Sequence, residues 1–296
     1  MKPAPFQYIA PVTLMEALDI MSHHGADAKL LAGGQSLIPV MNFRLAQPAV
    51  IVDLNKLLEL GRLDISDDGG LRIGAMVRHS QLENSDVVTD CAPLVHEAMP
   101  FVAHPQIRNR GTIGGSLAHA DPAAELPVVM VALQARFLLR KRGHERWVNA
   151  EAFYQSLFTT ALELDEILVA IEIPPLSRRS GYAFLEFSRR HGDYAQAGVA
   201  ATVTLDESGN CRQARLVYLN LGEIPMVAGE AAAALAGQPP SAALINDVAM
   251  HAAQHEIEPA ADIHATADYR RHLAFVLGKR AIETAVSRAR DGWSLE

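Results

Sequence analysis

Apolar residues recur at helical spacing near the start of the chain, and short apolar runs follow them. A helix is predicted from apolar side chains one turn apart, at Leu14, Ala17, Leu18 and Met21. Thr13 and Glu16 have the spacing of a capping box and would open this helix. The apolar runs 28–32 and 50–54 predict two buried strands. Residues 1–56 are therefore expected to form a small α/β unit.

The next stretch mixes strand and helix signals. Residues 71–75 alternate apolar and polar side chains, as a half-buried strand does. Ser80 and Glu83 have the spacing of a second capping box, and they predict a helix that is interrupted or restarted at Pro93. We expect residues 57–176 to form a second α/β unit.

The most apolar window of the chain, 126–139, indicates a buried helix followed by a strand. It is shorter than the roughly 20 apolar residues that a membrane span needs, so no span is expected. Asp121 and Pro122 are typical of an N-cap and a first helical residue, which places the helix at 123–133. The apolar run Ile167–Ile173 predicts a further buried strand.

A linker-like segment, 177–181, marks the expected start of a third unit that covers residues 177–296. Strands are predicted over 199–205 and 211–221, separated by a turn. The chain beyond about residue 240 is rich in alanine and has a helical pattern.

Composition excludes several classes of function. The 296 residues carry a net charge of −8, which disfavours a nucleic acid as the partner because phosphate binding requires a basic surface. The two cysteines, Cys91 and Cys211, are too few to hold a [2Fe–2S] cluster or a Cys₄ zinc site, and no metal site is predicted. The N-terminal residues lack the apolar run of a secretory signal, so we expect a reducing cytoplasm.

Two glycine-containing loops are the strongest candidates for a binding site. They are 32–36 (Ala-Gly-Gly-Gln-Ser) and 111–116 (Gly-Thr-Ile-Gly-Gly-Ser). Glycine lets successive backbone N–H groups approach a bulky anion such as a dinucleotide pyrophosphate. Neither loop matches the Rossmann or P-loop pattern. One Gly-Gly pair alone is more often a simple turn, but two such loops, each beside an apolar run and each with a hydroxyl side chain, favour a ligand.

Several segments together resemble one known family. Residues 29–39 are similar to the first FAD loop of the medium subunits of molybdenum hydroxylases, which include the carbon monoxide dehydrogenase, quinoline oxidoreductase and xanthine dehydrogenase families. Residues 106–116 resemble their second loop. Further matches in order and spacing are 120–125, 165–168, 189–195 and 269–281. The resemblance extends over essentially the whole chain.

The resemblance implies an α+β fold of the vanillyl-alcohol-oxidase type, with two α/β subdomains that bind FAD and a C-terminal sheet-and-helix domain. It implies that main-chain amides hold the FAD pyrophosphate and ribityl chain at Ala32, Gly33, Gly34, Gln35, Ser36, Leu37, Gly111, Thr112, Ile113, Gly114, Gly115 and Ser116. Glu125 is the candidate side chain for binding a hydroxyl group of the flavin. The backbone of Leu168 is the candidate for contact with the adenine side of FAD. Asp193 and Tyr194 are expected beside the isoalloxazine ring.

The same resemblance implies a division of labour between subunits. Substrate is expected to be hydroxylated at a molybdopterin cofactor on a large subunit, so this chain has no catalytic residue of its own. Electrons would pass through [2Fe–2S] clusters on a small subunit to FAD here and then to an external acceptor. A dimer of heterotrimers is expected. The amino-acid sequences of segments 102–104 and 115–121 look most similar to those of N-heterocycle hydroxylases, which favours an N-heterocyclic substrate. The alternatives are a self-sufficient FAD oxidase or dehydrogenase of the same fold and a binding module without redox chemistry.

Two departures from the family pattern bear on the electron acceptor and the loop. Ser116 stands where some members have Asn, and Leu185 and Glu186 stand where xanthine dehydrogenases have Lys near the Arg pair. NAD as the acceptor is therefore in doubt.

Weaker candidates have ordinary alternatives. His251 and His255 lie one helical turn apart but lack a third ligand, so a solvated helix face is favoured over a metal site. His104 and His119 flank the second loop, where a capping or supporting role is favoured over contact with the flavin. Arg108 and Arg110 fit either a phosphate or ordinary ion pairs, and both possibilities remain open.

Overall fold

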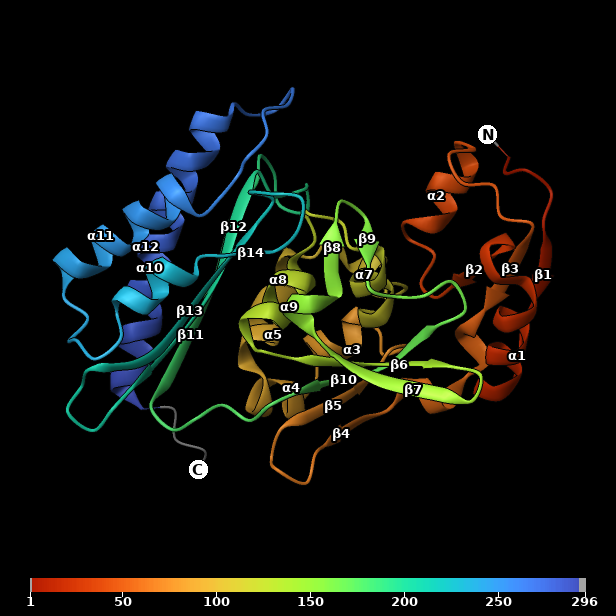
Figure 1. Cartoon of the computed structure of the whole chain (residues 1–296), viewed down its shortest axis with the longest axis horizontal. Helices are drawn as coiled ribbons and strands as arrows, with labels where there is room; N and C mark the ends of the chain where they lie inside the picture. The colour runs from red at the N-terminus through yellow and green to blue at the C-terminus, as the bar shows by residue number, and fades with distance from the viewer. Residues whose placement is uncertain (1, 293–296) are drawn as a thin grey trace.

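The computed structural model describes residues 2–292, which fold around three main sheets that lie in a row from the N-terminal to the C-terminal part of the chain (Figure 1). A fourth sheet, in the middle region, has only two short strands. The first sheet has three parallel strands in the order β1-β3-β2. Its elements are β1 (Gln7–Ile9), α1 (Leu14–His24), η1 (Gly25–Asp27), β2 (Ala28–Leu31), α2 (Leu37–Asn42), β3 (Val50–Asp53), η2 (Leu54–Lys56) and η3 (Leu58–Gly61). The predicted helix and both predicted strands of this region are confirmed.

Helix α1 begins where the sequence indicates. The side chain of Thr13 accepts a hydrogen bond from the backbone N–H of Glu16 at 3.2 Å. The carboxylate of Glu16 accepts from the N–H of Val12 rather than from Thr13, so the reciprocal bond of the capping box is displaced by one residue. The apolar face of α1 is buried against β3 and β6.

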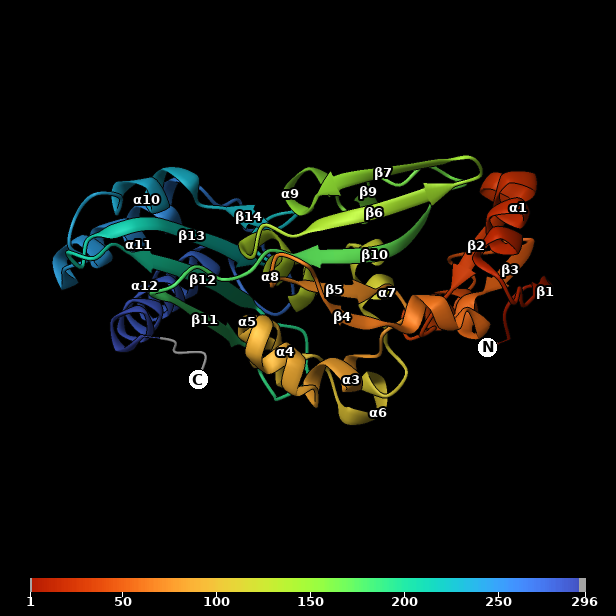
Figure 2. The same cartoon turned by 90° about the horizontal axis from the view of Figure 1, so that it is seen from below.

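The second sheet has five antiparallel strands in the order β4-β5-β10-β6-β7. Its helices lie along one face of the sheet, as the view from below shows (Figure 2). The elements are β4 (Leu63–Ile65), β5 (Leu71–Gly74), α3 (His79–Glu83), α4 (Asp86–Cys91), α5 (Pro93–Ala98), η4 (Met99–Phe101), α6 (Pro105–Arg108), α7 (Ile113–His119), α8 (Glu125–Ala132), β6 (Arg136–Lys141), β7 (His144–Asn149), α9 (Ala150–Phe153), β8 (Tyr154–Ser156), β9 (Thr159–Thr160) and β10 (Ile167–Ile173).

Two helix starts in this region differ from the prediction. Ser80 lies inside α3, because Arg78 is the N-cap and the side chain of Gln81 accepts from its N–H at 2.8 Å. The expected cap at Asp121 is also wrong, since its carboxylate accepts from Ala123 in a turn that precedes α8. The second error arises because a short polar side chain can satisfy a turn as well as a helix end, as Asp121 does here.

The third sheet is antiparallel, in the order β11-β12-β13-β14. One of its faces packs against α12 and, through β13, against α10, while the other face packs against α5 and α8 of the middle region. The elements are β11 (Ser180–Phe187), β12 (Ala197–Leu205), β13 (Cys211–Leu219), β14 (Met226–Val227), α10 (Gly229–Ala234), α11 (Ala242–His255) and α12 (Ala267–Asp291).

The middle and C-terminal regions share an apolar core. Phe184, Val217 and Leu219 of the third sheet belong to the same buried cluster as the helices on the second sheet. The N-terminal unit joins the second sheet through a separate cluster that includes Leu138 and Val169. None of the helices formed by residues 2–292 combines the length and the apolar character that crossing a bilayer requires.

Candidate functional site

The first glycine loop connects the carboxyl end of β2 to α2. Gly34 has a φ of 73°, a conformation that favours glycine, and the side chain of Gln35 donates to the carbonyl of Gly33 at 3.1 Å. Within residues 2–292, no acceptor is found for the backbone N–H groups of Gly33, Gly34, Gln35, Ser36 and Leu37. Backbone donors that the protein leaves unpaired must bind water or a ligand. The loop therefore presents a run of available donors of the kind that binds an anion.

The second glycine loop leads into α7 and has a different hydrogen-bonding pattern. Five of its N–H groups already donate within the protein: Gly111 to Ile107 O (2.7 Å), Ile113 to Val77 O (3.0 Å), Gly114 to Ala75 O (2.9 Å), Gly115 to Thr112 Oγ1 (3.1 Å) and Ser116 to Thr112 O (3.1 Å). Thr112 is thus the N-cap of α7. This differs from the expectation that both loops present amides to a ligand.

The two loops lie against each other. A methyl group on Gly33 would be 2.4 Å from the carbonyl oxygen of Arg110 and 2.8 Å from the Cα of Gly111. One on Gly115 would be 3.6 Å from the Cβ of Ala32. The approach at Gly33 leaves no room for a side chain, whereas the distance at Gly115 is an ordinary packing contact. The structure therefore brings the two loops together, as a single binding site requires.

A short chain of hydrogen bonds ties the loops together. The amide of Asn55 donates to the carbonyl of Ala32 at 3.0 Å. The guanidinium of Arg78 donates to Oδ1 of Asn55 at 2.5 Å and to the carbonyl of Arg110. Burial and the charge of Arg110 lower the pKa of Arg78, although a guanidinium stays protonated in proteins. The charges of Arg78, Arg110 and Asp53 thus lie together near the end of β2, where the first loop begins. The balance of charge among these three groups is positive, which suits a diphosphate.

A buried histidine supports the second loop. A methyl group on Gly111 would lie 2.7 Å from Nδ1 of His79, so the imidazole packs directly against the loop. Burial, together with Arg108 and Arg78, lowers the pKa of His79 to about 4. His79 is therefore neutral at physiological pH, and its ring acts as a packing surface.

Carboxyl groups and a tyrosine gather beyond the far end of α7. Glu125 is 9% exposed at the start of α8, and burial raises its pKa to about 7, with a further contribution from Asp121. Tyr194 is 75% exposed, and partial desolvation together with Asp121 and Glu125 raises its pKa. The predicted residues Glu125 and Tyr194 therefore lie near each other although they belong to different regions of the chain.

Two further predicted residues, Leu168 and Asp193, lie on β10 and in the loop between β11 and β12. Leu168 is buried in β10 opposite Leu139, so only its backbone is available for contact. Asp193 lies in a turn after Gly192, where its N–H donates to the carbonyl of Arg190 at 3.1 Å. Strand β10, which holds Leu168, packs against α7, the helix that begins in the second loop.

The secondary candidates have structural roles. Arg108 forms a buried ion pair with Glu83, with Nε 2.7 Å from the carboxylate, whereas Arg110 is exposed beside the first loop. The ring of His104 packs against Gly192, and that of His119 lies 5.2 Å from that of Phe158.

The histidine pair on α11 has an acidic neighbour. The rings of His251 and His255 are 4.9 Å apart, and Nε2 of His251 is 3.5 Å from Glu230. Among the described residues, no group of three or more His, Cys, Asp or Glu side chains is arranged to hold a metal.

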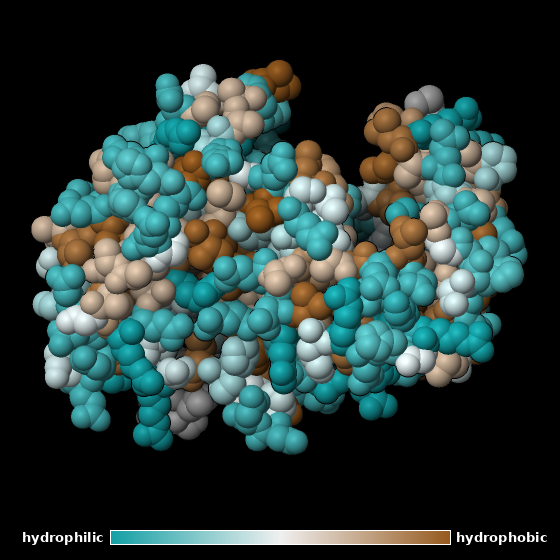
Figure 3. Space-filling model, viewed as in Figure 1, coloured by the Kyte–Doolittle hydropathy of each residue, from teal (hydrophilic) through white to brown (hydrophobic). Residues whose placement is uncertain are grey.

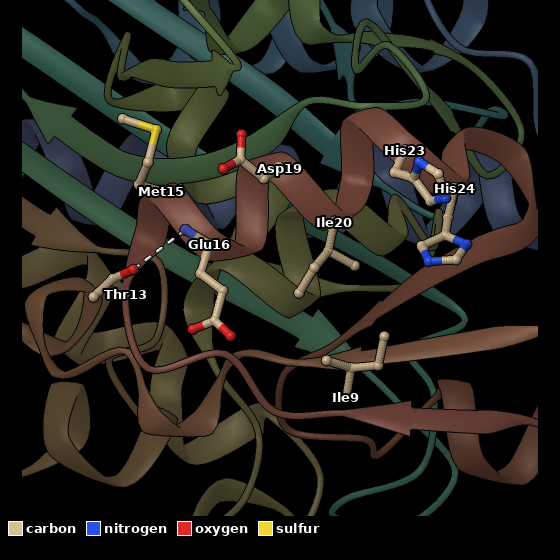
Figure 4. Close-up of a pocket in the computed structure, with 8 residues that line it drawn as sticks. All are labelled: Ile9, Thr13, Met15, Glu16, Asp19, Ile20, His23 and His24. Carbon is tan, nitrogen blue, oxygen red and sulfur yellow. Dashed lines mark hydrogen bonds between the residues drawn. The ribbon is translucent and has the colours of Figure 1, made fainter.

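The surface has a notch and a separate shallow depression. The notch separates the lobe that carries α2 from the lobe that carries α7 and β9 (Figures 1 and 3). The depression, of about 570 Å³, lies on α1 and is lined by residues that include Glu16, Asp19 and His23 (Figure 4). It opens to solvent, and no residue of either glycine loop lines it. We therefore assign the candidate site to the glycine loops and not to this depression.

Sequence reasoning missed the residues that connect the loops. Asn55 lies in η2, two residues after the end of strand β3, and polar residues just beyond a buried strand are a signal that could have found it. Arg78 has no comparable signal, because its partners lie 23 and 32 residues away in the chain. Arg270, on α12, is buried and donates to the carbonyls of Gln196 and Asn220, which fixes the segment after Tyr194.

Comparisons with known proteins agree along the whole chain. A family model described as the FAD binding domain in molybdopterin dehydrogenase matches residues 4–176, and one described as the CO dehydrogenase flavoprotein C-terminal domain matches residues 182–285. The chain is 42% identical to the 6-hydroxypseudooxynicotine dehydrogenase complex subunit alpha of Paenarthrobacter nicotinovorans, covering 98% of this chain and 97% of that one. It is 40% identical to the caffeine dehydrogenase subunit beta of a Pseudomonas strain, covering 97% of each.

A solved structure gives the same result for the fold. Carbon monoxide dehydrogenase from Hydrogenophaga pseudoflava, in a form that lacks the Mo-pyranopterin moiety of the molybdenum cofactor, contains a chain with a TM-score of 0.93 to this one. The two chains are 36% identical, and the match covers 97% of this chain and 99% of the other. The expected α+β fold with a C-terminal domain is confirmed.

Proposed function

Because the chain belongs to the family of FAD-binding medium subunits of molybdenum hydroxylases, we propose that it holds FAD between its two glycine loops and serves as the electron-exit subunit of such a complex. When bound, FAD supplies the redox chemistry, and the chain supplies binding, orientation and electrostatic tuning. The division into units 1–56, 57–176 and 177–296 is part of this proposal.

The unpaired amides of the first loop carry the proposal. Five successive N–H groups, from Gly33 to Leu37, have no acceptor among residues 2–292, and the loop that holds them packs at Gly33 against the second loop. A run of free amides of this kind suits the charge of a diphosphate. The full proposed set of FAD contacts is Ala32, Gly33, Gly34, Gln35, Ser36, Leu37, Gly111, Thr112, Ile113, Gly114, Gly115, Ser116, Glu125, Leu168, Asp193 and Tyr194. In the second loop, the contribution would come from side chains, Cα atoms and the N–H of Thr112.

Partner subunits are the second part of the proposal. Phe43 and Leu45, which are 66% and 80% exposed, follow α2 on the lobe that borders the notch. Large apolar side chains grouped on a surface favour a protein partner. We propose a large molybdopterin-binding subunit and a small iron–sulfur subunit as partners, assembled as a dimer of heterotrimers. The iron–sulfur ligands must come from another chain, because the two cysteines here cannot supply four.

The substrate class and the compartment follow as finer proposals. One relative is named for caffeine, which is an N-heterocycle, and this supports an N-heterocyclic or related substrate for the complex. Cys91 and Cys211 are both free thiols, which suits a reducing cytoplasm. Leu185 and Glu186 stand where xanthine dehydrogenases have a lysine ahead of the Arg pair, which disfavours NAD as the external electron acceptor.

Cofactor analysis tests the proposal. The isolated chain is expected to bind one FAD and to show the flavin absorbance maximum at about 450 nm. The complex purified from its source is expected to contain molybdenum, iron and FAD together. A chain that stays colourless with added FAD, or full activity in a preparation free of molybdenum and iron, would contradict it.

A further inference from the structure

Two glutamates face each other at the junction of the middle and C-terminal regions. Glu125 begins α8 and Glu186 lies near the end of β11. Glu186 is two residues beyond Phe184, so it faces the same side of the sheet, toward the core shared with α8. Its Oε2 is buried, and within residues 2–292 it has no hydrogen-bond partner. An unpaired polar atom in this position requires a proton, a water molecule or a ligand.

The surroundings of this pair are acidic. Asp121 lies near Glu125, and Tyr194 lies near both of these carboxyls. Glu97 on α5 accepts a hydrogen bond from the N–H of Phe184, two residues before Glu186. The nearby cations are engaged elsewhere, because Arg288 pairs with Glu97 and Arg270 pairs with Asp262. Over the described chain, none of the ion pairs includes Glu125 or Glu186.

Burial and mutual repulsion keep protons on the pair. Burial raises the pKa of Glu125 to about 7, and burial together with the charge of Glu125 raises that of Glu186 to about 8. Two coupled carboxyls titrate as a unit. Near neutral pH the pair therefore holds at least one proton.

The position of the pair fits the ring end of a flavin. Helix α7 begins within the second glycine loop, and its C-terminal end leads to the turn at Asp121 and then to Glu125. Tyr194, the candidate aromatic neighbour of the ring, adjoins the same carboxyls.

We propose that Glu186 is a further residue of the FAD site, and that the Glu125–Glu186 pair must carry a proton for FAD to bind tightly. The inference rests on the proposed function. A neutral ring placed over the pair removes water from it, and two uncompensated carboxylates without water are strongly unfavourable. FAD binding is therefore coupled to proton retention by the pair.

The direction of the pH dependence follows from this coupling. FAD favours the protonated pair, so binding raises its proton affinity above that of the free chain. Affinity for FAD is then full below about pH 7 and falls as the pH rises through the range in which the free pair loses its proton. The fall is at most about tenfold per pH unit for each proton.

Titration of the full chain, freed of FAD, tests the inference. We expect the Kd for FAD, measured by fluorescence between pH 6 and 9, to rise roughly tenfold over this range. Calorimetry at pH 8 in two buffers of different ionisation enthalpy should show uptake of up to one proton for each FAD. Glu186→Gln, which mimics the protonated side chain, should bind FAD as wild type does at pH 6.5, without pH dependence or proton uptake.

Control variants distinguish an effect of the Glu125–Glu186 pair from a general effect of removing a carboxylate or of unfolding. Glu145→Gln removes an exposed carboxylate that pairs with Arg140, and it should behave as wild type does at every pH. If Glu186→Gln unfolds, Glu125→Gln serves as the second variant, with thermal unfolding measured for both. A wild-type Kd that is independent of pH, or an unchanged pH dependence in a folded Glu variant, overturns the inference. Failure of wild type to bind FAD at any pH overturns the proposed function instead.

Discussion

The two glycine loops look alike in sequence and differ in what their backbones do. In the first loop, five successive N–H groups have no acceptor among residues 2–292. In the second, five of six N–H groups donate to the protein itself, and the glycines allow close contacts with His79, Ala75 and Thr112. The first loop therefore offers hydrogen-bond donors, and the second offers a rigid surface on which the first loop rests. A Gly-Gly pair does not by itself reveal which of these roles it has.

The largest expected effect concerns the support beneath the second loop. His79 has a pKa of about 4 in the folded chain and about 6.5 when unfolded, so the unfolded chain binds more protons between these pH values. The free energy of unfolding should fall by roughly 3 kcal/mol as the pH drops from 6.5 to 4. Urea titrations of wild type and His79→Leu over this range test the point. The two proteins should differ in their pH slope, and identical slopes would contradict the assigned role of His79.

A substitution at the contact between the loops should weaken FAD binding. In Gly33→Ala, the new methyl group would lie 2.4 Å from the carbonyl oxygen of Arg110, which pushes the loops apart. We expect a loss of about 2 kcal/mol in binding, or roughly thirtyfold in Kd, with a smaller change in the melting temperature. Fluorescence titration with FAD measures it, and an unchanged Kd would show that the contact is irrelevant to binding.

The matched change in the second loop should act on stability instead. In Gly114→Ala, the methyl group would meet the Cβ of Ala75 at 2.5 Å inside the core. Overpacking of this kind costs about 1.5 kcal/mol, or a few degrees in melting temperature. The Kd for FAD of the folded variant should rise less than that of Gly33→Ala. A large loss of affinity at full stability would reverse the roles assigned to the two loops.

The hydroxyl side chains of the loops should show the smallest difference. Thr112→Ala removes the cap of α7 and should lower the free energy of unfolding by about 1 kcal/mol. Ser36→Ala removes a hydroxyl that makes no capping bond, so its effect on unfolding should be below about 0.5 kcal/mol. Denaturant unfolding of both variants provides the comparison, and equal losses would contradict it.

Much of the fold could be predicted from local patterns. The strands at Val50–Asp53 and Ile167–Ile173 and the capped start of α1 follow from apolar runs and from Thr13. The starts of α3 and α8 could not be predicted correctly, because Ser80 and Asp121 are equally compatible with helix interiors and turns.

The site was predictable only where it follows a local motif. The glycine loops and Glu125 are part of such motifs. The bonds from Arg78 to Asn55 and to Arg110 depend on how distant segments pack, and so does the facing of Glu186 toward Glu125. Nor does sequence tell whether an amide is already paired, because its acceptor can be a carbonyl far along the chain, as Ala75 is for Gly114.

Hydrogen exchange of the backbone amides, with and without FAD, tests the central claim most directly. Without FAD, amides 33–37 should exchange fast, while amides 111, 113–116 should already be protected. Adding FAD should slow exchange strongly in the first loop and change the second loop little. Exchange in residues 33–37 that does not respond to bound FAD would contradict the account.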